Sequence, residues 1–251
     1  MPKLALAVFP LIEDLDVAYQ KMVEYIDQAA EANCSLIVFP EATLGGIDIQ
    51  GKPEADISKS VALDSAYIEK LRGYARKHNI GVGFGFLESE KNRIFDSFLL
   101  LNPDGETSLH YRRISPGWLT SNADQDIYRC GKDLGIAHTP WGKIAVLICG
   151  DLFMEELAKE TAAQKPDLVL HILARAYPFG TDIQRQWDEL EFPWYLSEYA
   201  KFDAPVAVVN VLDGRIEDGH VYCGGAWYVK DGKPVASKEL MTPGLLFVDL
   251  P

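Results

Sequence analysis

The stretch that decides the fold is Leu36-Ile37-Val38-Phe39-Pro40-Glu41, in which a carboxylate directly follows an unbroken apolar run. A short, continuous apolar run is typical of a strand in a sheet that is covered on both faces. Pro40 ends this strand, so we expect Glu41 at its carboxyl end. A carboxylate there is costly to bury unless it has hydrogen-bond partners or a task.

A second apolar strand is predicted from Lys143 to Ile148, and it ends at Cys149. Gly150-Asp151 and a predicted helix follow, so the thiol is expected near a helix N-terminus, which would lower its pKa. The alternative is a buried cysteine that acts as a small apolar residue. Open α/β sheets place their sites at the carboxyl ends of strands, and Cys149 with Glu41 would make a nucleophile and a base.

The rest of the chain alternates strands with helices and hairpins, which favours a layered α/β sandwich. Helices are predicted from Leu15 to just before Ser35, after a cap at Asp64, over 153–164, and over 182–202 with a break at Pro193. Further strands are predicted over 3–9, 80–87, 94–101, 107–113, 167–173, 205–211, 221–229 and 245–249. Periodicity disappears over 111–133, and a loop of that length usually has a function.

The composition is that of an ordinary globular protein. Of the 251 residues, 48% are apolar and 24% are charged, enough for a substantial core, and we predict one domain over 1–251. The formal net charge is -13 and the basic residues are dispersed. Both features argue against a nucleic-acid partner, because a phosphate backbone would be repelled.

The cysteine pattern indicates reduced thiols. The four cysteines, which lack CxxC spacing, are Cys34, Cys130, Cys149 and Cys223. Nothing in the sequence indicates export, so we expect a cytosolic protein without disulfides. The apolar segment 4–11 has no small-residue cleavage site behind it, and no later run reaches the roughly 20 apolar residues of a membrane helix. We therefore predict neither a signal peptide nor a membrane association.

Three short segments carry a family resemblance. Phe39-Pro40-Glu41-Ala42, Tyr111-Arg112-Arg113-Ile114 and Ile148-Cys149-Gly150-Asp151 resemble, in order and separation, the signature segments of the nitrilase (carbon-nitrogen hydrolase) superfamily. Trp141-Gly142-Lys143-Ile144 and Gly224-Gly225-Ala226 also fit, so the similarity spans nearly the whole chain. The resemblance implies a four-layer αββα sandwich, protomers that pair as homodimers through a helical face, and no metal or organic cofactor.

The resemblance also implies catalytic roles. Glu41 would be the general base and Cys149 the nucleophile that forms a thioester with a small amide, carbamoyl or nitrile compound. Arg113 stands where most members have a lysine, and its permanent charge would stabilise a developing oxyanion. Two rival functions stay open: a catalytically impaired relative that binds a metabolite or a partner subunit, and an acyl or amide transferase.

Two further positions follow from the resemblance. Arg175 and Tyr177 fall where family members line the substrate pocket, and Ala174 to Pro178 would supply an oxyanion-hole amide. Arg175 would recognise a carboxylate bidentately, or else serve as a salt-bridge partner. The second glutamate that many members carry after the lysine is absent here, and Asp124 or Asp126 would either replace it or lie in water.

Overall fold

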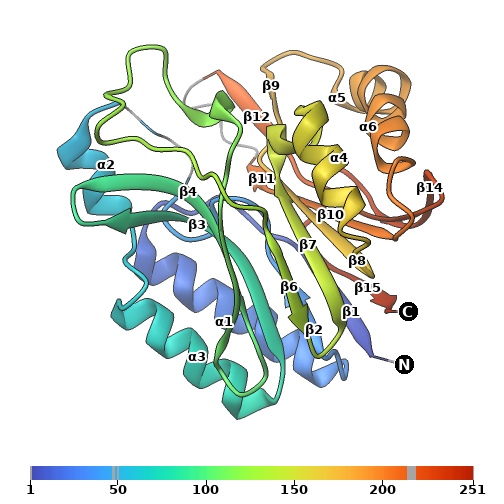
Figure 1. The fold of residues 1–251 in the computed structure, drawn as a ribbon, viewed down its shortest axis with the longest axis horizontal. Coiled ribbons are helices and arrows are strands. Elements are labelled where there is room, and N and C mark those ends of the chain that lie inside the picture. The colour runs from blue at the N-terminus through green and yellow to red at the C-terminus, as the bar shows by residue number, and fades with distance from the viewer. Residues whose placement is uncertain (1, 47–48, 50, 214–218, 251) are drawn as a thin grey trace.

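The computed structural model describes residues 2–46, 49, 51–213 and 219–250. Two six-stranded sheets stack on each other, with α1 and α3 against one outer face and α4 and α6 against the other (Figure 1). This is the four-layer αββα sandwich that the sequence predicted, and the α/β class is confirmed.

The first sheet has the strand order β15-β1-β2-β3-β4-β5. Its strands are β1 (Lys3–Val8), β2 (Leu36–Val38), β3 (Gly81–Glu90), β4 (Arg93–Leu101), β5 (Thr107–Arg112) and β15 (Gly244–Asp249). The strands β1, β2 and β3 run parallel, whereas β3, β4 and β5 form antiparallel pairs. Both faces of β2 are covered, because Ile37 packs toward the helices and Leu36 and Val38 pack between the sheets, and this explains its continuous apolar run.

The second sheet has the order β14-β13-β10-β8-β7-β6. Its strands are β6 (Ile136–Thr139), β7 (Gly142–Ile148), β8 (Leu168–Leu173), β10 (Val206–Asn210), β13 (Ala226–Lys230) and β14 (Lys233–Lys238). A small third sheet joins β9 (Ala176–Pro178), β11 (Leu212–Asp213) and β12 (His220–Cys223). The central strands β7, β8 and β10 are parallel, so their carboxyl ends lie at one edge.

The helices are α1 (Leu15–Glu31), α2 (Pro53–Lys59), α3 (Ala66–His78), α4 (Glu155–Ala163), α5 (Ile183–Arg185) and α6 (Phe192–Tyr199). Two short 3-10 segments, η1 (Pro116–Trp118) and η2 (Cys149–Phe153), and a π-helical turn, η3 (Gln186–Glu191), complete the elements. The predicted helices match α1, α3 and α4 closely.

Alternating side chains on the strands separate the layers. On β1, Ala5 and Ala7 pack toward the helices α1 and α3, whereas Leu4 and Leu6 pack between the sheets. The strand β7 repeats this pattern on the other sheet. Its even-numbered apolar residues 144, 146 and 148 face the first sheet, and residues 145 and 147 face α4 and α6. The period of two in each strand therefore produces three apolar interfaces between four layers.

Three local predictions were wrong. The cap of α3 is Ser65, whose side chain accepts a hydrogen bond from Ile68 N, and not Asp64. Pro193 does not break a helix, because it occupies the first turn of α6, where a missing N–H costs nothing. The strand predicted over 221–229 is divided into β12 and β13 by Gly224 and Gly225, which both have positive φ.

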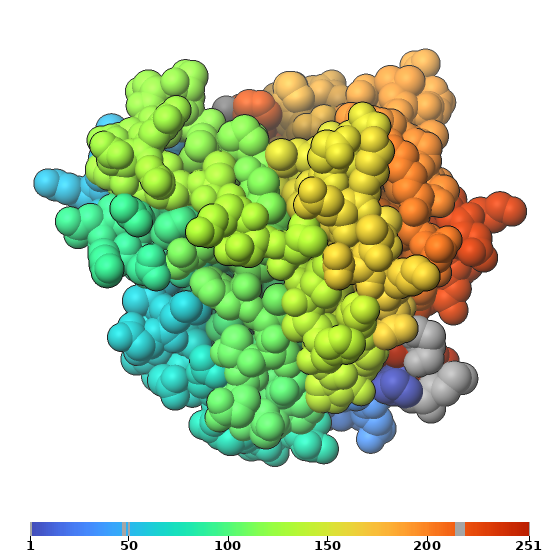
Figure 2. All heavy atoms as spheres, viewed as in Figure 1, coloured from blue at the N-terminus to red at the C-terminus, as the bar shows by residue number. Residues whose placement is uncertain are grey.

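The long loop that follows β5 has a small core of its own. Trp118 and Tyr128 are buried with Ile49, Leu87 and Ile94. Tyr128 also donates a hydrogen bond from its hydroxyl to Asp56 in α2, 2.5 Å away. The loop forms the light green lobe at the upper left of the space-filling view (Figure 2). It is thus packed onto β3 and β4.

Among the described helices, none is long and apolar enough to cross a membrane.

Gly85 in β3 lets that strand approach the turn that carries Glu41. A Cβ atom at this position would lie 2.6 Å from Glu41 Cα and 2.7 Å from Ala42 N. Both contacts are with backbone, which cannot move aside cheaply.

We therefore expect Gly85→Ala to lower the free energy of unfolding by about 1–3 kcal/mol, because the backbone around Glu41 must shift. The matched control is Gly73→Ala in α3, where an added Cβ meets nothing within 4 Å. That change should stabilise the protein by about 1 kcal/mol through helix propensity. Chemical denaturation of both variants measures the difference, and equal stabilities would contradict the close approach.

Candidate active site

Three residues singled out in the sequence meet at the carboxyl ends of strands. Glu41 follows β2, Arg113 follows β5, and Cys149 follows β7. Arg113 Nη1 lies 2.7 Å from Glu41 Oε1, and both side chains are buried. Burial and the negative charge of Glu41 raise the pKa of the Cys149 thiol to about 12, against the opposing positive charge of Arg113. The structure thus brings the two charged groups into contact beside the cysteine.

Arg113 is held by more than Glu41. Its Nε donates to Ser115 Oγ at 2.7 Å, and Nη1 also lies 3.3 Å from Asp96 Oδ2. The guanidinium is therefore fixed in a plane between several partners, as its fork geometry favours. The preceding residue, Arg112, forms ion pairs with Glu88 and Glu90 instead. Arg113, and not Arg112, is the arginine that enters the site.

Asp96, in the middle of β4, was missed in the sequence analysis. Its side chain is 7% exposed and lies beside Glu41 and Arg113. Burial and the charge of Glu41 raise the pKa of this carboxyl well above its usual range. The signal was present, because Asp96 is an acidic residue inside the stretch Ile94 to Leu101, which is apolar apart from Asp96 and Ser97, and an unexplained carboxylate there is expensive.

Cys149 lies on a strained turn. Its φ is +47°, in the left-handed region that a residue with a side chain seldom adopts. The Nε2 of the buried His171 lies 2.9 Å from the Cys149 carbonyl oxygen, which can only accept a hydrogen bond. Nδ1 lies 2.7 Å from the Tyr199 hydroxyl, which then donates to it. Burial lowers the pKa of His171 to about 4, so a neutral imidazole supports the turn.

Asp151 ties this turn to the arginine segment. Its Oδ1 accepts hydrogen bonds from Ser115 N at 2.7 Å and from Ile114 N at 3.2 Å. Its Oδ2 accepts from Tyr111 Oη at 2.7 Å and from Ile148 N at 3.0 Å. One buried carboxylate therefore joins two of the three motifs, which lie about forty residues apart in the chain.

The expected lowering of the thiol pKa is wrong. The segment behind Cys149 is the short 3-10 turn η2 and not the start of a long helix, so its dipole is small. Burial and Glu41 dominate, and the resting thiol is protonated at neutral pH. Arg113 and a hydrogen bond from the backbone of Ala174 favour the thiolate. An amide at Ala174 next to the sulfur fits the expected oxyanion-hole segment.

Arg175 and Tyr177 lie together, but the guanidinium has a partner within the chain. Arg175 binds Glu191 through two hydrogen bonds of 2.7 and 2.6 Å and lies 4.6 Å above the ring of Tyr177. This is the salt-bridge alternative that the sequence left open. The substrate-binding roles of Arg175 and Tyr177 stay predictions.

Asp124 and Asp126 lie in the exposed part of the loop. The side chain of Asp126 is 99% exposed, and Asp124 accepts a hydrogen bond from Asp126 N. The second carboxyl group beside Glu41 comes instead from Asp96. No cluster of three His, Cys, Asp or Glu side chains that would suit a metal ion occurs within the described ranges.

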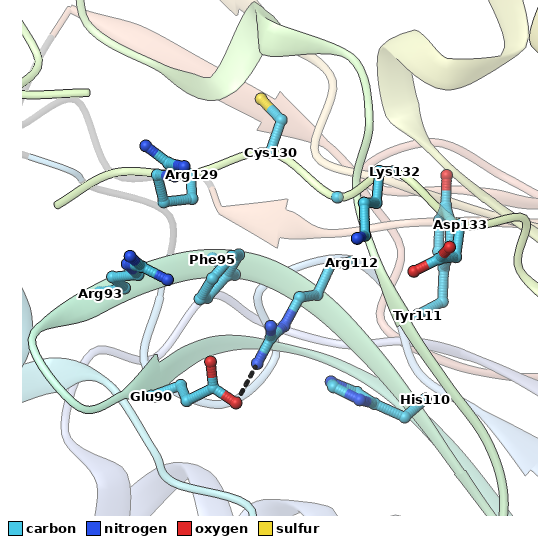
Figure 3. A pocket seen from close by; sticks show the side chains of 11 residues that line it. Glu90, Arg93, Phe95, His110, Tyr111, Arg112, Arg129, Cys130, Lys132 and Asp133 are labelled. Atoms are coloured by element: carbon cyan, nitrogen blue, oxygen red, sulfur yellow. Dashed lines mark ion pairs between the residues drawn. The ribbon is translucent and has the colours of Figure 1, made fainter. Parts of the chain in front are cut away.

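A separate pocket opens on the other side of β4 and β5 (Figure 3). Arg93, Arg112 and Lys132 line it, and Arg112 points at Glu90. It contains neither Glu41 nor Cys149. Arg112 and Glu90, which both line this pocket, already form an ion pair with each other. We therefore assign the pocket no role in the chemistry of Cys149.

Comparisons with known proteins identify the family of this chain. The model of the carbon-nitrogen hydrolase family matches residues 3–251. A cyanide hydratase from Gibberella baccata is 27% identical over 94% of this chain and 75% of its own length. An arylacetonitrilase from Hypocrea virens is 27% identical over 75% of this chain and 57% of its own length.

Solved structures share the fold. An amidase from Nesterenkonia sp. superposes with a TM-score of 0.79 at 22% identity, covering 100% of this chain and 90% of the amidase. A mutant of the amidase from Nesterenkonia sp. AN1, with a TM-score of 0.78 at 21% identity, covers 100% of this chain and 94% of its own. That structure shows the result of Michael addition of acrylamide at its active-site cysteine.

We expect Asp151→Asn to lower the free energy of unfolding by about 2–4 kcal/mol, because an amide nitrogen would face two N–H or O–H donors that now have an acceptor. Chemical denaturation measures this loss. Asp126→Asn, in a side chain that is 99% exposed, is the matched control and should change stability by less than about 0.5 kcal/mol. A comparable loss of stability in both variants would refute the stabilising role of the Asp151 hydrogen bonds.

Alkylation of Cys149 by iodoacetamide should accelerate about tenfold per pH unit between about pH 7 and 9, because only the thiolate reacts and the thiol pKa is about 12. Glu41→Gln should make alkylation faster at each pH, since it removes a negative charge that opposes the thiolate. Peptide mass spectrometry follows the reaction, with Cys149→Ala reporting the background from Cys130. A rate that levels off below pH 8 would contradict the raised pKa.

Proposed function

The chain belongs to the carbon-nitrogen hydrolase family, and on that premise we propose that it hydrolyses the carbon-nitrogen bond of a small amide, carbamoyl or nitrile compound through a thioester on Cys149. The observation that carries this proposal is the buried contact of 2.7 Å between Glu41 and Arg113 beside the thiol. Burying two charges is costly, and active sites are where such groups are kept for a task.

In the first step Cys149 attacks the carbon of the substrate, and its proton passes to Glu41. Since the resting thiol is protonated, proton removal must accompany the attack and a base must be at hand. Glu41 suits this role, because its Oε2 is buried and has no hydrogen-bond partner among the described residues. Oε1 meanwhile stays bound to Arg113.

The second half of the reaction releases the products. For an amide, Glu41 returns the proton to the leaving nitrogen, the C–N bond breaks, and the thioester remains. Water then attacks the thioester carbon while Glu41 takes its proton, the C–S bond breaks and the carboxylic acid leaves, and Glu41 returns the proton to the Cys149 thiolate. For a nitrile, the attack gives a thioimidate whose nitrogen takes the proton from Glu41; a water must then add to its carbon and ammonia must leave before the same thioester forms.

Arg113 supplies the positive charge. Its place beside Cys149 suits a charge that offsets the developing oxyanion, together with the backbone N–H of Ala174. The guanidinium is oriented by Glu41, Asp96 and Ser115, so no rearrangement is needed during the reaction. This anchoring supports the proposal that Arg113 can take the catalytic role of the family's lysine.

We also propose that two protomers pair through a helical face, as the family resemblance implies, and that this face is the one that carries α6. Trp194 and Leu190 on this side are 52% and 63% exposed, which is unusual for large apolar side chains on one small surface. A cytosolic location likewise stays a prediction from the cysteine pattern.

The test is ammonia release from a panel of small amides, carbamoyl compounds and nitriles. The protein should turn over at least one of them, and Cys149→Ala should lose on the order of 10³-fold or more of that activity. Cys130→Ser is the matched control, a second cysteine close to the site that should keep activity. Glu41→Gln should lose activity as well, because both the attack by Cys149 and the attack by water need this base.

Two outcomes would support the rival functions. If no compound is turned over and a ligand from the panel binds equally well to Cys149→Ala, the chain is a catalytically impaired family member that binds a metabolite. If added amines or hydroxylamine divert the acyl group in preference to water, the protein is a transferase.

A further inference from the structure

Asp96 places a second carboxyl group in the catalytic centre, and the ion pairs described above do not balance its charge. Asp96 and Glu41 both contact the same nitrogen, Arg113 Nη1, at 3.3 and 2.7 Å. If both carboxyls were ionised beside a neutral thiol, two negative charges would share one positive charge in a buried site. Like charges this close cannot both stay ionised without a large cost.

The proton that relieves this cost belongs on Asp96. Arg113 is closer to Glu41 than to Asp96, so it stabilises the charged form of Glu41 more strongly. Asp96 also faces a small hollow whose other lining residues are uncharged: Ala42, Gly46, Ile49, Leu87 and Trp118. An apolar hollow favours the neutral form of a carboxyl group.

We propose that Asp96 is a positioning residue that carries a proton in the resting active site and donates it as a hydrogen bond to Glu41. Asp96 Oδ2 accepts from Arg113, which leaves Oδ1 to hold the proton. Asp96 interacts with Glu41 through a side-chain hydrogen bond, which requires one of the two carboxyls to be protonated; in this proposal the acceptor is Glu41 Oε1, so Oε2 stays free for Cys149. The bond fixes the carboxylate of Glu41 for its exchange of protons with Cys149.

The remaining groups around Asp96 do not remove the need for this proton. The titratable and charged side chains that act on it from the packed elements are Glu41 behind β2, Tyr111 and Arg113 of the β5 segment, Cys130 of the loop and Cys149 behind β7. Of these only Arg113 is positive. Burial and the charge of Glu41 raise the pKa of Asp96, which favours its protonated form, and the proton is lost only as pH rises through that raised value.

A kinetic consequence follows that rests on the proposed function. Ionisation of Asp96 at high pH adds a negative charge beside Glu41 and Cys149, which opposes formation of the thiolate and lowers kcat. Asp96→Asn keeps a neutral group with an N–H donor. It should retain neutral-pH activity within about tenfold and lose the alkaline decline of kcat, whereas Asp96→Ala should lose about 10- to 100-fold of kcat for want of the hydrogen bond.

Infrared spectroscopy tests the proton without any turnover. Wild-type protein at neutral pH should show the C=O band of a buried carboxylic acid, and labelling aspartate with ¹³C at its side-chain carboxyl should shift that band. The band should be missing in Asp96→Asn and present in Cys149→Ala and Asp126→Asn. The labelled wild type by itself reports whether an aspartate is protonated. The measurement is therefore still informative if a variant fails to fold.

The outcomes separate this proposal from the proposed function. Absence of a label-sensitive band in wild type, or its persistence in Asp96→Asn, would overturn the protonated Asp96 even if the protein hydrolyses amides. An alkaline decline of kcat that is unchanged in Asp96→Asn would also count against it. A band that behaves as expected in a protein without turnover would support the proton and refute only the hydrolase.

Discussion

The ion pair between Arg113 and Glu41 is the contact on which the candidate site depends. Neither side chain would be stable where it is without the other, because an unpaired buried charge costs several kcal/mol. Their 2.7 Å contact joins the ends of β2 and β5, and its charges act directly on the thiol of Cys149. The positions of Ser115 and Asp96 follow from the remaining hydrogen bonds of the guanidinium.

The stacked sheets provide the frame for this pair. Apolar side chains from β1, β2 and β7 fill the space between the sheets, so strands from both sheets end close together. Asp151 then locks the turn of Cys149 to the arginine segment through four hydrogen bonds, and His171 holds the carbonyl of the strained cysteine. The φ of +47° at Cys149 is sustained by these contacts and not by its own preference.

Electrostatics at the site favour a neutral thiol at Cys149 in the resting protein. Burial and Glu41 keep the thiol protonated, while Arg113 and the Ala174 amide oppose them. Such a balance suits a nucleophile that is activated only when a base takes its proton during the attack. It also separates this site from cysteines that are reactive because they are already ionised at neutral pH.

The sequence by itself determined the layers and the motif residues. The alternation of strands with helices and hairpins predicted a layered α/β sandwich, and the resemblance of three ordered segments to the nitrilase superfamily implied its four layers and the roles of Glu41, Arg113 and Cys149. These features are local, so they can be read along the chain. Only the tertiary structure decided which carboxyl stands beside Glu41, that Arg175 binds Glu191, and that the thiol pKa is raised. Contacts between distant residues and the loss of water around them depend on packing, which no single segment encodes.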